Sequence, residues 1–291
     1  MEVQIGEIDK RKVKYMLAEV TYSTASYESA RKYNVKMAYK KGKADKVFEY
    51  CEKDLSESFW KKNEKILSCK RGAGYWVWKP YVVKKALDEL QEGDYLFYCD
   101  SGVFLTKRIA PLIAFMEKEK QDFLLFDLES VEKNWTKRDV FIDLGCDDAK
   151  YTESRQRCAT YFLIKKTEET MKFVEQWLEY AQKYELISDE DNILHHMPNY
   201  EGFRDNRHDQ SIFSVLSKKW GYKSYQDISQ YRYPRGLKER IVAKKNQKEV
   251  APYPVCVCIH RQKKADCTSA LREKILDYFP NLSRLLHYGY H

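Results

Sequence analysis

The chain reads R-G-A-G-Y-W-V-W-K-P over residues 71–80 and G-D-Y-L-F-Y-C-D-S-G over residues 93–102. These two stretches predict a helix, a turn and a buried strand that runs directly into the carboxylate of Asp100. A hydrophobic core does not need an arginine and a lysine beside two tryptophans, and a solvated loop does not need the tryptophans. The combination indicates a site that holds a flat, polar and anionic ligand.

Strand and helix patterns alternate on both sides of this unit. Residues 13–21 are predicted as a strand, residues 25–40 have helical periodicity, and Lys46–Tyr50 is a short second strand. The same alternation continues toward residue 260. It predicts an α/β fold with a mostly parallel central sheet flanked by helices. Ligands of such sheets bind beyond the carboxyl ends of the strands, where Tyr22 and Asp100 are expected.

Composition and length fit one large domain or two small ones. The 291 residues are 43% hydrophobic, which is ample for a sizeable core. No apolar run approaches the roughly 20 residues of a transmembrane helix, and the N-terminus lacks the apolar region of a signal peptide. The eight cysteines are scattered, and Cys256-Val257-Cys258 does not have the C-x-x-C spacing of a zinc site. We therefore expect a cytoplasmic protein with reduced thiols.

The net charge and its distribution indicate which partners the chain can bind. The net charge of +8 suits an anionic substrate or an anionic membrane surface. Basic residues are dispersed apart from the segment 235–248, and no nucleic-acid-binding motif is present, so nucleic acid is not an expected partner. We expect one domain over residues 1–268 and an amphipathic helical segment over residues 269–291. That segment either packs onto the domain or makes a peripheral contact with the inner face of a membrane.

Two residues at strand ends are candidates for chemistry. Asp100 ends a hydrophobic strand at the carboxyl edge of the sheet, where oxygen ligands suit Mn²⁺ or Mg²⁺; the alternative is an aspartate that caps a turn. His260 ends an apolar stretch and precedes several cations. It is either a ligand of a metal or phosphate, or a histidine satisfied within the surface.

A third candidate lies in the stretch R-H-D-Q-S over residues 207–211. Asp209 is either the cap of a helix or, together with Gln210, a group that faces the ligand as acid, base or hydroxyl partner. The opening motif has two interpretations as well. Its tryptophans either pack in the core beside a lysine that extends to solvent, or Arg71 and Lys79 offer their cations to phosphate or sugar oxygens.

In this order the three motifs resemble those of GT-A fold (Rossmann-like) glycosyltransferases. The similarity is to bacterial and viral enzymes of surface-glycan synthesis with R-G-x-G-Y-W-x-W-K-P, G-D-x-x-x-Y-x-D-x-G and R-x-D-Q-S, and more remotely to family 8 and family 32 transferases. It covers roughly residues 13–260. The resemblance implies a hexosyl- or pentosyltransferase that uses a nucleotide sugar, commonly UDP-linked, and a hydroxyl of a glycan or lipid-linked glycan acceptor. The alternative is a non-catalytic module that binds carbohydrate or nucleotide.

The resemblance also implies roles for individual residues. Asp209 and Gln210 would be catalytic, and Asp100 with His260 would hold Mn²⁺ or Mg²⁺. The implied donor-binding residues are Tyr22, Arg71, Gly74, Trp78, Lys79, Asp100, Ser101 and Lys263. If the enzyme inverts configuration, Asp209 is the expected base, with Asp147 or Asp148 as the next candidates.

This chain departs from the family at one position of the D-x-D motif. Gly102 stands where the family has a second aspartate, so one expected carboxylate ligand is missing. The alternative is a metal-independent enzyme in which Arg71, Lys79 or Lys263 neutralises the diphosphate. The sequence leaves open the donor sugar, the acceptor and the stereochemistry of transfer.

Overall fold

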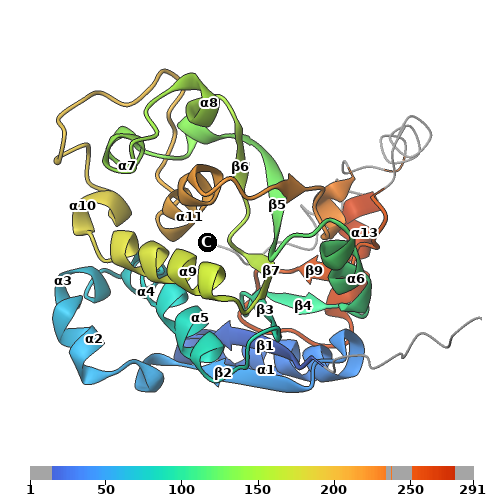
Figure 1. Cartoon of the computed structure of the whole chain (residues 1–291). Coiled ribbons are helices and arrows are strands. Elements are labelled where there is room, and N and C mark those ends of the chain that lie inside the picture. The colour runs from blue at the N-terminus through green and yellow to red at the C-terminus, as the bar shows by residue number, and fades with distance from the viewer. Residues whose placement is uncertain (1–14, 234–236, 238–250, 279–291) are drawn as a thin grey trace, which may run out of the picture.

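The computed structural model describes residues 15–233, 237 and 251–278 (Figure 1). A seven-stranded sheet with the order β2-β1-β3-β7-β5-β6, and with β8 beside β5, forms its centre. A two-stranded ribbon of β4 and β9 lies apart from it. The strands are β1 Leu17–Tyr22, β2 Lys46–Tyr50, β3 Tyr95–Cys99, β4 Val103–Leu105, β5 Phe123–Val131, β6 Arg155–Arg157, β7 Tyr161–Lys165, β8 Ser224–Tyr225 and β9 Val257–Ile259.

Helices flank the sheet, as the alternating pattern predicted (Figure 1). The longer ones are α1 Glu28–Met37, α5 Trp78–Asp88, α6 Ala110–Lys118, α9 Glu168–Ala181, α11 Asp209–Lys219 and α13 Ser269–Tyr278. The shorter ones are α2 Glu57–Lys62, α3 Glu64–Leu67, α4 Gly72–Tyr75, α7 Arg138–Asp143, α8 Ala149–Thr152 and α10 Tyr184–Ile187. The predicted α/β class, with a central sheet between helices, is confirmed.

The sheet is mixed, with β6 and β7 running opposite to the other five strands. β1 runs parallel to β2 and β3, and β8 runs parallel to β5, but β7 is antiparallel to both β3 and β5. β6 and β7 both return along β5, with Arg157 opposite Asp127 and Leu163 opposite Leu124. Cys158 between them also donates its backbone N–H to Phe126 of β5, so β6 and β7 act as one interrupted antiparallel strand.

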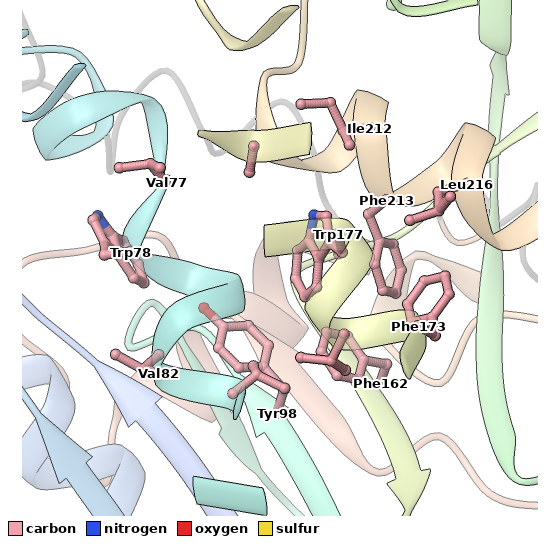
Figure 2. Close-up of a cluster of buried hydrophobic side chains, with 14 of the residues drawn as sticks. Val77, Trp78, Val82, Tyr98, Phe162, Phe173, Trp177, Ile212, Phe213 and Leu216 are labelled. Carbon is pink, nitrogen blue, oxygen red and sulfur yellow. The ribbon is translucent and has the colours of Figure 1, made fainter. Parts of the chain in front are cut away.

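Both faces of the sheet are buried, which explains the continuous apolar sequence of β3. Leu96 and Tyr98 point into one hydrophobic cluster, whereas Tyr95, Phe97 and Cys99 point into another on the opposite face. Figure 2 shows the first cluster, in which side chains of α5, α9 and α11 converge on β3 and β7. Strands covered on both sides need apolar residues on both sides. The packing holds α5 and α11 rigidly over the end of β3.

Helix α9 illustrates how local sequence sets these elements. Thr167 caps its first turn by accepting the backbone N–H of Thr170, whose side chain bonds back to the N–H of Thr167. Its buried face includes Phe173 and Trp177, which meet Phe213 of α11 (Figure 2). Because this contact fixes α11 against α9, the first residue of α11 has a defined position beside the sheet.

Two predictions concern segments that the structure covers only in part. Among the described residues, no helix is both long enough and apolar enough to cross a membrane. Helix α13 begins the segment 269–291, and Leu271 and Ile275 on it are exposed. Residues 279–291 lie outside the described part, as does the basic segment 235–248 apart from Leu237. A membrane contact therefore stays a prediction.

Candidate active site

A cavity of about 950 Å³ opens beside the end of β3. Its wall is formed by the turn before α5, residues 127–130 of β5, the first residues of α11, and the loops that follow β8 and β9. Five of the predicted site residues line it together although they are far apart in the sequence: Arg71, Lys79, Asp100, Asp209 and Gln210.

The glycine-rich motif folds into a left-handed turn. The backbone φ is positive at five consecutive residues, namely Gly72 (60°), Ala73 (50°), Gly74 (92°), Tyr75 (51°) and Trp76 (60°). Each residue with a side chain costs roughly 1–2 kcal/mol in this conformation. The backbone approach is also close, since a Cβ on Gly74 would lie 2.8 Å from the Cα of Leu67. Strain of this kind persists where the surroundings impose it, and it concentrates at functional sites.

The turn sends its aromatic rings in two directions. Trp76 is half-buried and lines the cavity, whereas Trp78 is buried and stacks on Tyr22 with ring centroids 3.9 Å apart. The indole N–H of Trp78 donates to the carbonyl of Gly72 at 3.0 Å, which ties the turn to α5. Tyr22, Gly74 and Trp78, predicted to contact the donor, thus lie behind the cavity wall and support it.

A buried lysine joins two carboxylates at the cavity wall. Nζ of Lys79 lies 2.8 Å from Oδ2 of Asp209 and 3.4 Å from Oδ1 of Asp100, and it donates to the carbonyl of Ala159 at 3.2 Å. The hydroxyl of Tyr98 donates to Oδ1 of Asp100 at 2.5 Å. Lys79 and Asp209 are each only 3% exposed, so their charges interact in a poorly solvated setting.

Burial and mutual charge set the protonation of this cluster. Burial raises the pKa of Asp209 to about 6; the Lys79 cation opposes this rise and the Asp100 charge adds to it. Burial alone would lower the pKa of Lys79, but the carboxylates of Asp100 and Asp209 together raise it, so Nζ keeps its proton. Burial raises the pKa of Tyr98 as well, so its hydroxyl stays a donor. A carboxylate that titrates near neutral pH is suited to proton transfer.

The residue before Asp209 is held in a strained conformation. His208 has φ 55° and ψ −118°, a region that residues with a side chain rarely occupy. Its ring stacks on Tyr75 at 4.9 Å, and its Nε2 lies 2.8 Å from Oδ1 of Asp189. Nη1 of Arg71 donates to the same oxygen at 2.7 Å. The left-handed turn and the start of α11 therefore brace each other.

Gln210 is held by the protein on both sides of its amide group. Its Oε1 accepts the backbone N–H of Ala159 at 3.1 Å, and its Nε2 donates to Oε1 of Gln156 at 2.9 Å. The same oxygen of Gln156 accepts from Nη1 of Arg207 at 2.7 Å. The Arg207 guanidinium lies over the ring of Trp135 at 3.9 Å. This row forms a rigid polar wall next to Asp209.

The two predicted metal ligands come from neighbouring segments, because the backbone N–H of His260 donates to the carbonyl of Gly102, two residues after Asp100. Asp100 lines the cavity, but His260 does not; its Nδ1 accepts the backbone N–H of Gln262, and burial lowers its pKa to about 4. The carbonyl of Gly102 accepts the N–H groups of His260 and Arg261, and a Cβ on Gly102 would lie 3.3 Å from the Cα of Arg261. The backbone of Arg261 thus lies in tight contact with the position from which the side chain of a second aspartate would start.

The predicted Mn²⁺ or Mg²⁺ site stays a prediction, in which Asp100 and Nε2 of His260, buried and unpartnered among the described residues, would hold the ion. Hard divalent cations require several oxygen ligands, and Asp100 is already bound to Tyr98 and lies 3.4 Å from the Lys79 cation. Across the part of the chain that the structure describes, no three His, Cys, Asp or Glu side chains are grouped to hold a metal.

The remaining predicted residues either lie outside the cavity wall or are bound by other groups of the protein. Ser101 is buried and Lys263 is exposed, and neither lines the cavity. Asp147 accepts from Arg138 and from the hydroxyl of Tyr200, and Asp148 caps α8. Arg71, predicted to neutralise a diphosphate, lines the cavity and is also bound to Asp189 and Asp205. The two reserve candidates for a base are therefore committed elsewhere.

Much of the cavity wall was not identified from the sequence. The missed charged and aromatic residues are Asp127, Glu129, Trp135, Arg155, Asp205, Arg207, Asp227, Tyr231, Arg232 and Arg261. One signal was available: Asp127 follows the buried run F-L-L-F just as Asp100 follows the buried strand Tyr95–Cys99. A carboxylate directly after a buried apolar run marked a residue of the cavity wall in both places.

No protein-family model and no curated protein sequence matches the chain. Among solved structures, mouse xyloside xylosyltransferase 1 aligns over 88% of this chain and 98% of its own, with 11% identity and a TM-score of 0.43. A glycosyltransferase involved in glycosylation of the major capsid of PBCV-1 aligns over 89% and 98%, with 7% identity and a TM-score of 0.42. The galactosyltransferase LgtC, in complex with donor and acceptor sugar analogs, aligns over 89% and 95%, with 15% identity and a TM-score of 0.42.

Each of these three proteins is a glycosyltransferase. Their similarity to this chain is remote in both identity and TM-score. Alignments at this level carry no information about chemistry, which has to be inferred from the side chains of the cavity.

Proposed function

We propose that this protein is a glycosyltransferase that moves a sugar from a nucleotide sugar to a hydroxyl of a glycan acceptor. The observation that carries the proposal is the buried Lys79, which joins Asp100 and Asp209 at the wall of a large polar cavity. The motif resemblance adds the expectation of a UDP-linked donor and of a surface polysaccharide or glycan as product. A cytoplasmic location, with a peripheral membrane contact for a lipid-linked acceptor, belongs to the same proposal.

In this proposal the acceptor hydroxyl attacks the anomeric carbon, and the bond from that carbon to the diphosphate oxygen breaks. Asp209 takes the hydroxyl proton in an inverting reaction, or stabilises the positive charge on the sugar ring in a retaining one. Its pKa of about 6 suits the first role at neutral pH. Lys79 fixes the carboxylate in place and keeps a positive charge at the reacting end of the cavity.

Two further cations are placed to stabilise the leaving diphosphate. Arg207 and Arg261 both line the cavity, and the charge of Arg261 contributes, after burial, to lowering the pKa of Arg207. Two guanidinium groups that repel each other across a cavity favour a polyanion between them. They replace Arg71 and Lys263 as the candidates for this task. Metal dependence stays a prediction that chelation tests.

A thermal-shift screen tests the proposal directly. The protein is melted with a panel of nucleotide sugars, each with Mn²⁺ and with EDTA. A donor at about 100 times its Kd stabilises the folded state by about 2.7 kcal/mol, so we expect a shift of about 5 °C or more for one nucleotide class. No shift with any nucleotide sugar would contradict donor binding. A shift without release of the nucleoside diphosphate would favour a non-catalytic binding module.

A further inference from the structure

A second pocket, of about 330 Å³, adjoins the main cavity. The two share Asp127, Arg155 and Ser224 in their walls, whereas Lys79 and Asp209 line only the main cavity. The second pocket therefore extends the cavity at a part of its wall that is separate from the proposed reacting groups. Its wall contains four cationic side chains, those of Lys150, Arg155, Arg157 and Lys218, and one carboxylate, that of Asp127. We call it the Arg157 pocket.

Arg157 is the unusual residue of this pocket. Its side chain is 7% exposed, yet it forms no ion pair with a carboxylate of the described residues. Nη1 donates to the hydroxyl of Ser217 at 2.9 Å and Nη2 to the carbonyl of Tyr222 at 2.6 Å, while Nε is buried and has no hydrogen-bond partner. A buried guanidinium with only neutral partners is costly to the folded state. An anion in the pocket would compensate it.

The surrounding charges do not remove this imbalance. Lys218 is bound to Glu132 and to the hydroxyl of Ser154. Lys150 and Arg155 are exposed, and neither pairs with a carboxylate within the described residues. Asp127 is the one carboxylate in the wall, and its charge and that of Glu132 behind the wall act on Arg157 without a direct ion pair. Positive charge therefore exceeds negative charge around an accessible volume.

We propose that the Arg157 pocket binds an anionic group, a carboxylate or a phosphate, of the acceptor whose remainder lies in the main cavity. The assignment to an acceptor rests on the proposed function, because the reacting end of the cavity is then taken by the donor. Planar guanidinium groups bind carboxylates and phosphates by paired hydrogen bonds. The substrate class that follows is an acidic glycan, in which a uronic acid or a phosphate substituent reaches beyond the reacting hydroxyl.

Binding is tested first, with inorganic phosphate and methyl glucuronide as probes. Both are titrated into ¹⁵N-labelled protein while the Nε–H signal of Arg157 is followed. We expect saturable shifts in the wild type, and binding about tenfold or more weaker in the double variant Lys150→Gln with Arg155→Gln, since two charge-assisted contacts are lost. Lys172→Gln, an exposed lysine of α9 paired with Glu168, is the matched control and leaves both affinities unchanged. Absence of any shift, or an equal affinity in the double variant, would overturn the anion site.

The source of the anion is tested next by turnover. Neutral and uronic-acid-containing oligosaccharides are compared as acceptors, and we expect the double variant to lose about tenfold in its preference for the acidic acceptor. An unchanged preference would overturn the assignment to the acceptor. Failure of the proposed function looks different: the wild type would release no nucleoside diphosphate from any donor, while the titration would still report anion binding.

Discussion

Two buried lysine–carboxylate pairs among the described residues, Lys79–Asp209 and Lys218–Glu132, have different surroundings. Glu132 accepts from Lys218 and also from the side chains of Thr136, Gln156 and Ser214, so both of its carboxylate oxygens are occupied. Asp209 has Lys79 as its one side-chain partner among the described residues. A saturated buried carboxylate serves the fold, whereas one that borders a cavity with hydrogen-bonding capacity left over is available to a ligand.

The backbone around the two pairs differs in the same way. His208, Tyr75 and Trp76, which lie next to Asp209 or brace it, all have positive φ. None of the side chains that bond to Glu132 comes from a residue with positive φ. Strain is thus confined to the pair that borders the cavity, as expected if the position of Asp209 matters for function more than for stability.

Replacing Asp209 by Asn is expected to have the largest effect. The amide cannot take a proton from the acceptor, so release of nucleoside diphosphate should fall by about 10²–10⁴-fold. Stability should be kept or slightly increased, because Lys79 retains Asp100 and one buried charge is removed. Turnover measures the loss of activity, and urea denaturation of the same preparation measures the free energy of unfolding. If the variant kept its activity, Asp209 would have no role in the reaction.

Glu132→Gln should act in the opposite sense. Lys218 would lose its carboxylate partner in a buried network, so the free energy of unfolding should drop by about 3–5 kcal/mol while activity per folded molecule is retained. The matched control is Glu153→Gln, which removes an exposed partner of Lys133 and should cost less than about 1 kcal/mol. Urea denaturation of the two variants measures the two losses in the free energy of unfolding. Equal losses would mean that the Glu132 network is not the structural pair.

The pH dependence of stability distinguishes the pairs further. The pKa of Asp209 is raised to about 6 from its ordinary 3.8, so the folded state binds a proton that the unfolded state has already released between these values. Stability should therefore fall as pH rises from about 4 to above 6, by at most about 3 kcal/mol. The measurement is the free energy of unfolding of the wild type minus that of Asp209→Asn, taken over this pH range. A difference that does not change with pH would contradict the raised pKa.

Ala73→Gly should have the smallest effect. Glycine adopts the left-handed conformation of Ala73 without the side-chain penalty, so the variant should be neutral or up to about 1 kcal/mol more stable. Thermal unfolding measures the change, and Ala86→Gly in the middle of α5 is the control, with an expected loss of about 1 kcal/mol. Loss of stability at both positions would show that the turn is not left-handed in solution.

The sequence predicted the parts of this site that depend on element ends. Asp100 follows a buried strand and Asp209 begins a helix, and both patterns are visible without the fold. The placement of Lys79, Asp100 and Asp209 in one site was implied by the family resemblance. What could not be predicted depends on tertiary packing. The positive φ of Ala73 and the stacking of Trp78 on Tyr22 are set by neighbours distant in the sequence.

The opposite wall of the cavity illustrates the same limit. β6 and β8 are three and two residues long, too short to show any periodicity, so Arg155 and its neighbours gave no signal. The antiparallel course of β6 and β7 was missed because alternation of strands and helices favours parallel pairing. The close approach of Arg261 to Gly102 likewise needs the folded chain.

The central claim is that Asp209 serves the reaction and Glu132 serves the fold. The most direct test is the rate of nucleoside diphosphate release from a nucleotide sugar, measured side by side for the wild type, Asp209→Asn and Glu132→Gln and normalised to folded protein. We predict a loss of at least about 100-fold for Asp209→Asn and a rate near that of the wild type for Glu132→Gln. Equal losses in both variants, or no release by the wild type with any donor, would contradict the account.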